Sequence, residues 1–314
     1  MKIVPGVAAL ETRAPRAVAI GNFDGVHLGH QALLRGARER AARYGGEATV
    51  LTFVPHPARL FAPEKAPALV MSLERRLELF AEAGMDLAIV EPFTRAFAAI
   101  EAEAFVRDVL ARDVGARDVV VGYDFSFGRA RTGNPDRLRA LGAALGIGVE
   151  VVAPVAIAGV ACSSTKIRAL VAEGRAVDAA AYLGRPFELE GRVVRGAGRG
   201  RAIGFPTANL APDGELLPRL GIYAARARVL DGPLAGERRK AALSVGRNPT
   251  FVPGGAAAPI TVEAYLLDFD GDLYDLRVRL EIGERLRDEQ RFASVEDLVA
   301  QIAADVARVK ALVW

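Results

Sequence analysis

GNFDGVHLGH, residues 21–30, joins a short apolar segment to a helical pattern. The apolar residues 17–20 before it predict a buried strand, and residues 31–43 after it predict a helix with one apolar side. Glycine lets a backbone approach an anion closely, and a helix N-terminus offers unpaired N–H groups. His27 and His30 share one face of the first helical turn, where both rings can donate hydrogen bonds to phosphate oxygens. The stretch therefore predicts a polyphosphate site at a strand-to-helix turn.

Length, charge and cysteine content limit the class of protein. The chain has 314 residues, which is enough for two domains that each bury a core. Its formal charge is only +3 at pH 7 and neither half is strongly basic, so nucleic acid is not an expected partner. Cys162 is the single cysteine, which excludes an intrachain disulfide. No apolar run is long enough for a bilayer and residues 1–5 lack a signal-peptide pattern, so we expect a cytoplasmic protein without a membrane partner.

Up to about residue 180, short apolar runs alternate with helical patterns. The expected strands are residues 17–20, 48–53, 87–90, 119–121 and 149–152. Ser72 and Asn134 are expected to cap the helices that follow them. This alternation predicts an α/β domain, a Rossmann-like parallel sheet with helices on both faces. Ligands bind beyond the carboxyl ends of such strands, which is where residues 21–30 lie.

The pattern changes after Phe187. Strands are expected over residues 190–194, 222–229, 241–245, 261–267 and 276–280, with Asp270-Gly271 as a hairpin turn. Such strands without intervening helices predict a small antiparallel β-barrel. Ser294 is expected to cap a C-terminal helix whose buried stripe is Val295, Leu298, Ile302, Val306 and Val309. Glycine and proline interrupt both patterns at residues 183–187, so we place the domains at residues 1–185 and 186–314.

The first domain offers residues suited to nucleotidyl transfer. There an ionised phosphate attacks the α-phosphorus of a nucleoside triphosphate, so charge stabilisation matters and no general base is required. His27 and His30 fit that role, and SSTKIR at residues 163–168 places hydroxyls and basic side chains at the start of another helix. Ser-Ser-Thr alone also fits an ordinary helix cap. Residues 122–128, GYDFSFG, follow a strand and can line the same pocket.

Zinc ligation is the alternative for the two histidines. A catalytic zinc needs three protein ligands, so His56 or a carboxylate would have to join His27 and His30. His56 lies between two prolines and is expected to be structural, with a pocket-lining role left open. The glycine-spaced Walker A pattern is absent, which argues against a P-loop enzyme.

Residues 191–209, GRVVRGAGRGRAIGFPTAN, carry the chemistry of the second domain. The glycines permit a loop over phosphates, and Thr207 and Asn209 offer oxygen ligands suited to Mg²⁺ bound to a nucleotide. Such loops also occur in RNA-contacting segments, although this domain has no net charge. Glu263, in an expected strand, is our candidate base for phosphorylating a neutral hydroxyl, while a lone strand glutamate is more often solvated.

Nine segments carry a family resemblance. GNFDGVHLGH, TFVPHP at residues 52–57, YDFSFG at 123–128 and SSTKIR at 163–168 resemble the nucleotidyltransferase module of bacterial bifunctional FAD synthetases. The segments that resemble a riboflavin kinase module are GRVVRGAGRGRAIGFPTANL at 191–210, GIYAARARV at 221–229, LSVGRNPTF at 243–251, VEAYLLDFDGDLYD at 262–275 and LRDEQRF at 286–292. The resemblance implies that the second domain makes FMN from riboflavin and ATP. The first domain would then join FMN to AMP from a second ATP, giving FAD and diphosphate.

The resemblance also implies roles for individual residues and Mg²⁺ as cofactor. In the kinase family, the threonine and asparagine of PTAN bind the metal–nucleotide and a strand glutamate activates the ribityl hydroxyl, which match Thr207, Asn209 and Glu263. Glu263, His27 and His30 are the expected catalytic residues. Nucleotide or phosphate binding is expected at Gly21, Phe23, Asp24, Gly29, Ser163, Ser164, Thr165, Arg168, Gly196, Gly200 and Arg201. Flavin binding is expected at Asp124, Phe125 and Phe127.

Two positions depart from the family pattern. Tyr265 stands where the family often has histidine, and Asp275 stands where it often has glycine. Two other functions remain as alternatives: a nucleotidyltransferase with another acceptor, such as pantetheine phosphate, and a non-catalytic flavin- or nucleotide-binding regulator. The sequence leaves the oligomeric state open.

Overall fold

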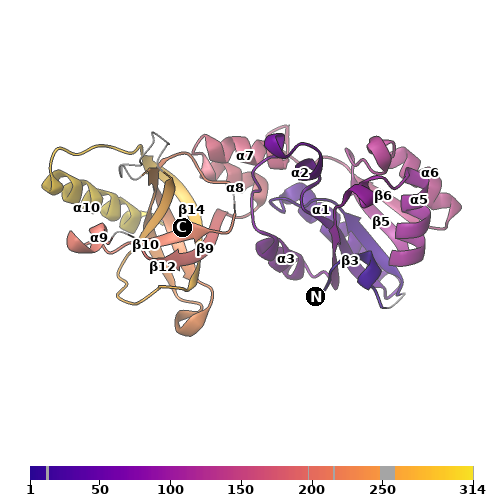
Figure 1. Cartoon of the computed structure of the whole chain (residues 1–314), viewed down its shortest axis with the longest axis horizontal. Coiled ribbons are helices and arrows are strands. Elements are labelled where there is room, and N and C mark those ends of the chain that lie inside the picture. Colours follow the sequence, from indigo (N-terminus) through magenta and orange to yellow (C-terminus); the bar gives the residue numbers. More distant parts are fainter. Residues whose placement is uncertain (12–13, 197, 215, 248–258, 314) are drawn as a thin grey trace. The chain divides into compact units, whose positions relative to one another are not determined.

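The computed structural model describes residues 1–11, 14–196, 198–214, 216–247 and 259–313 (Figure 1). Residues 248–251, the end of the LSVGRNPTF segment, lie outside this described part. Internal contacts divide the chain into two compact units, Met1–Ala68 with Leu73–Ser163, and Leu69–Ser72 with Ser164–Trp314. Helices α7 (Ser164–Ala172) and α8 (Ala176–Leu183) therefore group with the second unit, and the domain boundary at residues 185/186 stays a prediction.

A six-stranded sheet, parallel in every strand pair, forms the centre of the first unit, in the order β1-β4-β3-β2-β5-β6. Its strands are β1 (Lys2–Val4), β2 (Arg16–Ile20), β3 (Glu47–Val54), β4 (Leu87–Pro92), β5 (Ala116–Gly122) and β6 (Gly148–Val152). The five expected strands are all present, and β1 is an additional edge strand. The strand order reverses at β2, which pairs with β3 on one side and β5 on the other. The turn after β2 thus lies at a topological switch point, where such sheets bind ligands.

Helices cover both faces of this sheet, which confirms the predicted α/β architecture. The helices are α1 (Leu28–Ala42), α2 (Pro57–Phe61), α3 (Leu73–Glu82), α4 (Arg95–Ala98), α5 (Ala102–Ala104), the π-helix η3 (Phe105–Val114) and α6 (Pro135–Ala144). Short 3₁₀ turns form η1 (Val7–Ala9), η2 (Pro63–Lys65) and η4 (Arg129–Arg131), and β7 (Ala156–Ile157) pairs with β8 (Val160–Ala161). The cap predicted at Asn134 is confirmed, since its side chain accepts a hydrogen bond from the Arg137 N–H at 2.9 Å.

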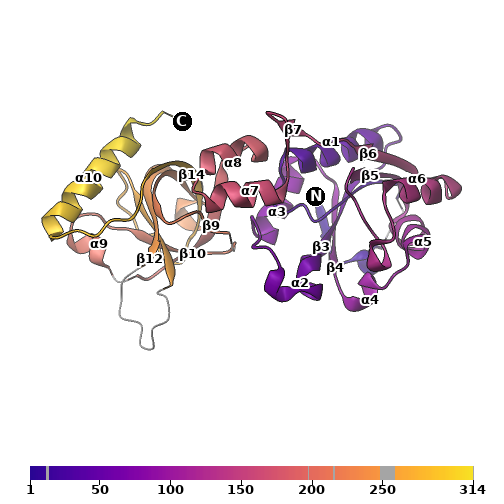
Figure 2. The same ribbon diagram turned by 90° about the horizontal axis from the view of Figure 1, so that it is seen from above.

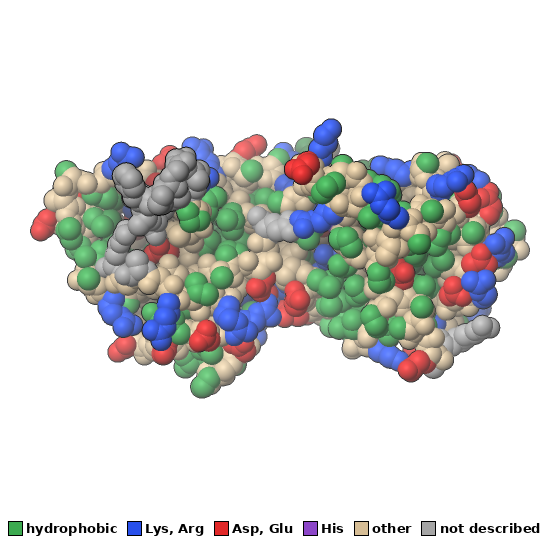
Figure 3. Space-filling model, viewed as in Figure 1, with side chains coloured by type: hydrophobic (Ala, Val, Ile, Leu, Met, Phe, Trp, Pro, Cys, Tyr) green, Lys and Arg blue, Asp and Glu red, His purple; other side chains and the backbone are tan. Residues whose placement is uncertain are grey.

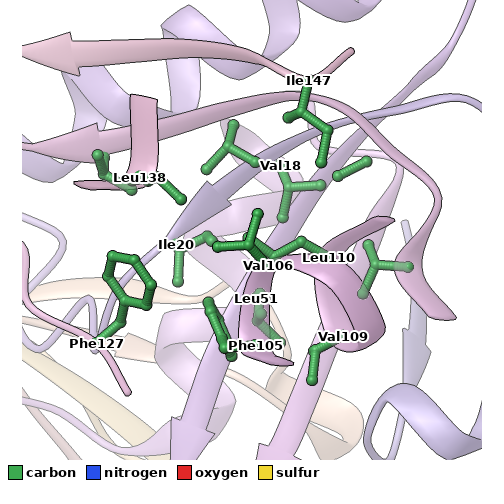
Figure 4. Packing of buried hydrophobic residues seen from close by; sticks show 14 of the residues in the cluster. Val18, Ile20, Leu51, Phe105, Val106, Val109, Leu110, Phe127, Leu138 and Ile147 are labelled. Carbon is green, nitrogen blue, oxygen red and sulfur yellow. The ribbon is translucent and has the colours of Figure 1, made fainter. Parts of the chain in front are cut away.

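A hydrophobic core of this unit lies on one face of the sheet. Val18 and Ile20 of β2 pack there against Val106 and Leu110 of η3 and Leu138 of α6 (Figure 4). Helix α1 lies on the opposite face, where a Cβ atom on Gly36 would be 3.3 Å from Val120 of β5. Because both faces are covered, residues 17–20 of β2 are fully buried, as their unbroken apolar run predicts.

The second unit contains a closed antiparallel barrel, in the order β10-β13-β12-β11-β14-β9. Its strands are β9 (Phe187–Val194), β10 (Ala208–Pro212), β11 (Gly221–Val229), β12 (Arg238–Arg247), β13 (Ile260–Leu266) and β14 (Arg277–Arg287). Helix α9 (Arg199–Ala202) precedes β10, and η5 (Gly232–Leu234) follows β11. The predicted barrel is confirmed. The predicted hairpin at Asp270-Gly271 is wrong, because β13 and β14 are not neighbours in the barrel and those residues lie in a longer loop.

The chain's last helix is α10 (Val295–Ala311), which runs along the outside of the barrel (Figures 1 and 2). Ser294 caps it by accepting a hydrogen bond from the Asp297 N–H at 3.1 Å, as predicted. Buried Asp305 anchors it to β14 through two nitrogens of Arg287 at 2.9 and 2.7 Å. Val309 is buried, but Val295 is exposed and does not belong to the buried stripe. A charged pair therefore contributes to docking beside the apolar stripe that the sequence predicted.

Candidate active sites

The turn between β2 and α1 has an unusual backbone. Phe23 and Val26 have φ angles of +52° and +39°, and Gly25 has +88°. Phe23 is fully buried, with its ring 5.2 Å from that of Phe80 and 5.2 Å from that of His30. Left-handed backbone at a bulky residue is unfavourable and persists where surrounding packing compensates for it. The buried ring of Phe23 therefore holds this turn in shape.

His27 is both the last residue of the turn and the N-cap of α1. Its Nδ1 accepts a hydrogen bond from the His30 N–H at 3.3 Å. A ring nitrogen that accepts carries no proton, so a neutral His27 carries its proton on Nε2 and can donate from there. The centroids of the two imidazole rings are 3.6 Å apart and the rings are stacked. Both rings therefore lie together at the N-terminus of α1.

Two glycines lie close to the aromatic rings of this turn. A Cβ atom on Gly29 would lie 3.1 Å from both Nδ1 and Cε1 of His27, and one on Gly21 would lie 3.3 Å from the Phe23 ring. The predicted phosphate residues Gly21, Phe23 and Gly29 thus come together with His27 in one turn. Asp24, also predicted here, is almost fully buried.

The zinc alternative finds no support in this geometry. His56 caps α2, where its Nδ1 accepts a hydrogen bond from the Ala58 N–H at 3.2 Å. Within the described part of the chain, no three histidine, cysteine, aspartate or glutamate side chains gather as a metal site.

Two side chains to which the sequence analysis assigned no role hold the same turn. Arg76 of α3 donates from Nη1 to the carbonyl oxygen of Asn22 at 2.8 Å, and the Thr52 hydroxyl of β3 donates to that oxygen at 3.3 Å. Burial lowers the pKa of the Arg76 guanidinium from its ordinary value, and the negative charges of Asp24 and Glu74 oppose this shift. Helical spacing could have indicated Arg76, because residues 73, 76, 77 and 80 share one side of α3.

The expected flavin residues lie in the loop after β5. Phe125 stacks on Phe127 at 5.5 Å with an angle of 17° between the rings. Phe127 is only 7% exposed and also contacts Phe105 of the core, whereas Phe125 is half-buried and Asp124 is exposed. Part of the Phe125 ring is therefore accessible to solvent, and the ring packs against the buried ring of Phe127.

The SSTKIR residues begin α7. Ser163 is the last residue of the first unit, and Ser164 is the first residue of α7 in the second. Thr165 is exposed and Arg168 is half-buried, while Ile167 between them packs into the interior. Their joint action with His27 and His30 stays a prediction.

The second site lies where β10 pairs with β13. Asn209 is directly opposite Glu263 in the strand register, and the Thr207 hydroxyl donates to Oε2 of Glu263 at 3.2 Å. The glycine-rich loop passes close to both. A Cβ atom on Gly196 would lie 2.3 Å from Nδ2 of Asn209, and one on Gly200 would lie 3.3 Å from the Thr207 hydroxyl. The structure thus brings four of the predicted residues of this domain to Glu263, and Arg201 is exposed on α9 nearby in the chain.

The two departures from the family pattern have local explanations. Tyr265 lies on the same side of β13 as Glu263, and its ring packs edge-on against Phe205 at 5.3 Å. Asp275 has a φ angle of +63°, a conformation that glycine adopts freely and that aspartate tolerates better than most residues.

The first unit is a parallel α/β domain with two stacked histidines at a helix N-terminus beside its switch point, and the second is a barrel that brings together a hydroxyl, an amide and a carboxylate. These two folds are typical of nucleotide-dependent transferases. The FAD synthetase family model matches residues 10–166, and the Riboflavin kinase family model matches residues 183–313. The chain belongs to the bifunctional riboflavin kinase/FMN adenylyltransferase family. Residues 167–182, which include most of α7 and α8, fall between the two matches, so neither match places the domain boundary.

Known relatives cover nearly the whole chain. Bifunctional riboflavin kinase/FMN adenylyltransferase from Escherichia coli K12 is 38% identical over 97% of this chain and 96% of its own length. The protein of the same name from Pseudomonas fluorescens is 38% identical over 99% of this chain and 98% of its own. A crystal structure of a protein named macrolide-efflux protein, from Streptococcus pneumoniae, superposes with a TM-score of 0.88 at 28% identity and full coverage of both chains. Among the described residues here, no helix has the length and apolarity to cross a bilayer.

Proposed function

We propose that residues 186–314 transfer the γ-phosphate of ATP to riboflavin, giving FMN and ADP. Residues 1–185 then join FMN to AMP from a second ATP, giving FAD and diphosphate. The observation that supports the kinase reaction is the hydrogen bond from Thr207 to Glu263 beside Asn209, because a carboxylate lies there next to a hydroxyl and an amide. Kinase activity in the barrel supplies the phosphate that is the nucleophile of the second reaction.

In the kinase reaction the nucleophile is a neutral hydroxyl, which gains from a base. We assign Glu263 as that base, since its carboxylate already accepts a hydrogen bond from a hydroxyl group. The Thr207 hydroxyl and the Asn209 amide oxygen suit Mg²⁺, which prefers hard oxygen ligands and binds with nucleotide phosphates. Bound there, the ion would neutralise charge on those phosphates. Gly196 and Gly200 let the loop backbone approach the same place.

In the adenylyl transfer the FMN phosphate attacks the α-phosphorus of ATP, and the bond from that phosphorus to diphosphate breaks. The attacking phosphate is already ionised, so the site needs alignment and charge stabilisation. We assign this role to His27, to His30 and to the N-terminus of α1. Phe125 with Asp124 is our proposed flavin contact, supported by Phe127.

A chromatographic assay tests the proposed function. The protein is incubated with riboflavin, ATP and MgCl₂, and riboflavin, FMN and FAD are separated over time. We expect FMN to appear first and FAD to follow, and excess EDTA to stop FMN formation. Supplying FMN instead of riboflavin isolates the second reaction. Failure to form FMN from riboflavin would contradict the kinase assignment, and failure to form FAD from FMN would contradict the adenylyltransferase assignment.

A further inference from the structure

Arg76 belongs to none of the family segments, yet it contacts the turn at the first site. It is only 4% exposed, and its Nη1 donates to the Asn22 carbonyl oxygen at 2.8 Å. Thr52, which is fully buried, donates to the same oxygen at 3.3 Å. Residues from α3 and β3 therefore converge on one carbonyl group of the turn that follows β2.

Fixing that carbonyl fixes the direction of the chain after it. A peptide group is planar and trans, so the orientation of the Asn22 C=O also sets that of the Phe23 N–H on the opposite side. Phe23 is the first of the left-handed residues in the turn, and four residues later His27 caps α1. Rotation of the 22–23 peptide would therefore move the His27 and His30 rings.

Burying the charge of Arg76 costs free energy, so the contacts that compensate for it are informative. Burying a guanidinium requires compensation from hydrogen bonds and opposite charge. Asp24, which is 2% exposed, provides opposite charge from within the turn itself. The neighbouring Arg75 is equally buried, but its guanidinium pairs with Glu78 at 3.0 Å and Glu82 at 2.8 Å on its own helix. Arg76 instead donates to the turn itself, at the Asn22 carbonyl oxygen.

We propose that Arg76 is a positioning residue for adenylyl transfer, which holds the Asn22 carbonyl, together with Thr52, so that the turn presents His27 and His30 to the phosphates. Arg76 acts through the turn and does not touch substrate. This inference rests on the adenylyl transfer proposed for the first unit.

Two variants of Arg76 test the inference, with Arg75→Met as the matched control. Arg76→Met removes the donor and the charge, and Arg76→Lys keeps the charge and one donor group. With FMN and ATP supplied, we expect Arg76→Met to lower kcat for FAD formation about 100-fold, the loss typical of a reacting group displaced by about 1 Å. The KM values should change much less, and Arg76→Lys should recover part of kcat. Arg75→Met should retain kcat, and FMN formation from riboflavin should persist in all three variants.

The outcomes separate this inference from the proposed function. Wild-type protein that forms no FAD would remove the proposed function itself. Wild-type activity with equal kcat in Arg76→Met and Arg75→Met would overturn only the role of Arg76. If Arg76→Met lowers the melting temperature but keeps the wild-type kcat at temperatures well below melting, Arg76 has a merely structural role. That result would also overturn the inference.

Thr52 provides the test if Arg76→Met does not fold. Thr52→Val removes the second donor to Asn22 without changing charge, and Thr52→Ser restores it. Thr49→Val is the matched control, because Thr49 is buried on the same strand and its hydroxyl donates to the Glu47 carbonyl at 3.3 Å. We expect a roughly tenfold lower kcat for FAD formation in Thr52→Val alone, since only one of the two donors is lost. Equal kcat in Thr52→Val and Thr49→Val would overturn the inference.

Discussion

The two candidate sites are assembled in different ways. In the first unit, residues 21–30 alone supply the turn, the helix N-terminus and both histidines. In the barrel, Thr207 and Asn209 reach Glu263 only because β10 pairs with β13. The first site presents imidazoles and backbone N–H groups, and the second presents a carboxylate. This difference matches the nucleophiles of the two proposed reactions. The ionised phosphate of FMN needs charge stabilisation, and the neutral hydroxyl of riboflavin gains from a base.

Substituting one residue at each site tests whether the two sites act independently. These two substitutions should have the largest effects. We expect Glu263→Gln to lower FMN formation by about 10² to 10⁴-fold, the range for loss of a general base. We expect His30→Ala to lower FAD formation from supplied FMN by about 10² to 10³-fold, the range for loss of a charge-stabilising donor. Each variant should keep the other activity, as chromatography of the products would show. Loss of both activities in a folded variant would mean that the sites are not independent.

A smaller effect is expected from Gly196→Ala in the barrel. The new Cβ atom would lie 2.3 Å from Nδ2 of Asn209, so the loop or the amide must move by about an ångström. We expect kcat/KM for FMN formation to fall about 100-fold. Gly214→Ala is the control, because the nearest atom to its Cβ would be 3.9 Å away. Similar rates in the two variants would show that the loop does not contribute to the site.

The corresponding change in the first unit is Gly29→Ala. Its Cβ atom would meet the His27 ring at 3.1 Å, which requires a shift of only a few tenths of an ångström. We therefore expect a roughly tenfold lower rate of FAD formation, measured with FMN and ATP. Alanine also favours helix over glycine, so the melting temperature should not fall. A lower melting temperature with unchanged activity would reverse this interpretation of Gly29.

Local sequence was sufficient to predict the fold of each unit. The alternation of strands and helices predicted the sheet around β2, and the change of period after Phe187 predicted the barrel. The predicted hairpin at Asp270-Gly271 failed because turn chemistry does not specify which strands pair. The prediction that Val295 is buried was wrong for a related reason. An apolar stripe identifies one side of a helix, but it does not show how far the partner surface extends.

The sites were predictable to the extent that their residues are contiguous or match a family segment. Arg76 was missed and Thr52, the first residue of the TFVPHP segment, was assigned no role, because both act through the Asn22 carbonyl and a backbone acceptor has no sequence pattern of its own. Charge in the sequence does not distinguish Arg75 from Arg76 either. On the face that Figure 3 shows, basic and acidic side chains are interspersed within each unit, so surface charge marks no site on that face.

The smallest effect is expected at Asp275, where the barrel departs from the family pattern. Its φ of +63° costs an L-residue free energy that glycine avoids, although aspartate is among the residues that tolerate it. Glycine also makes the unfolded chain more flexible, which cancels part of the gain. We therefore expect Asp275→Gly to raise the free energy of unfolding by about 0.5 kcal/mol, measured by urea denaturation. The KM for riboflavin should stay the same, because the N–H of residue 275 still donates to the Val193 carbonyl at 2.9 Å. A changed KM with unchanged stability would instead place this loop in the kinase site and extend that site beyond the β10–β13 pair.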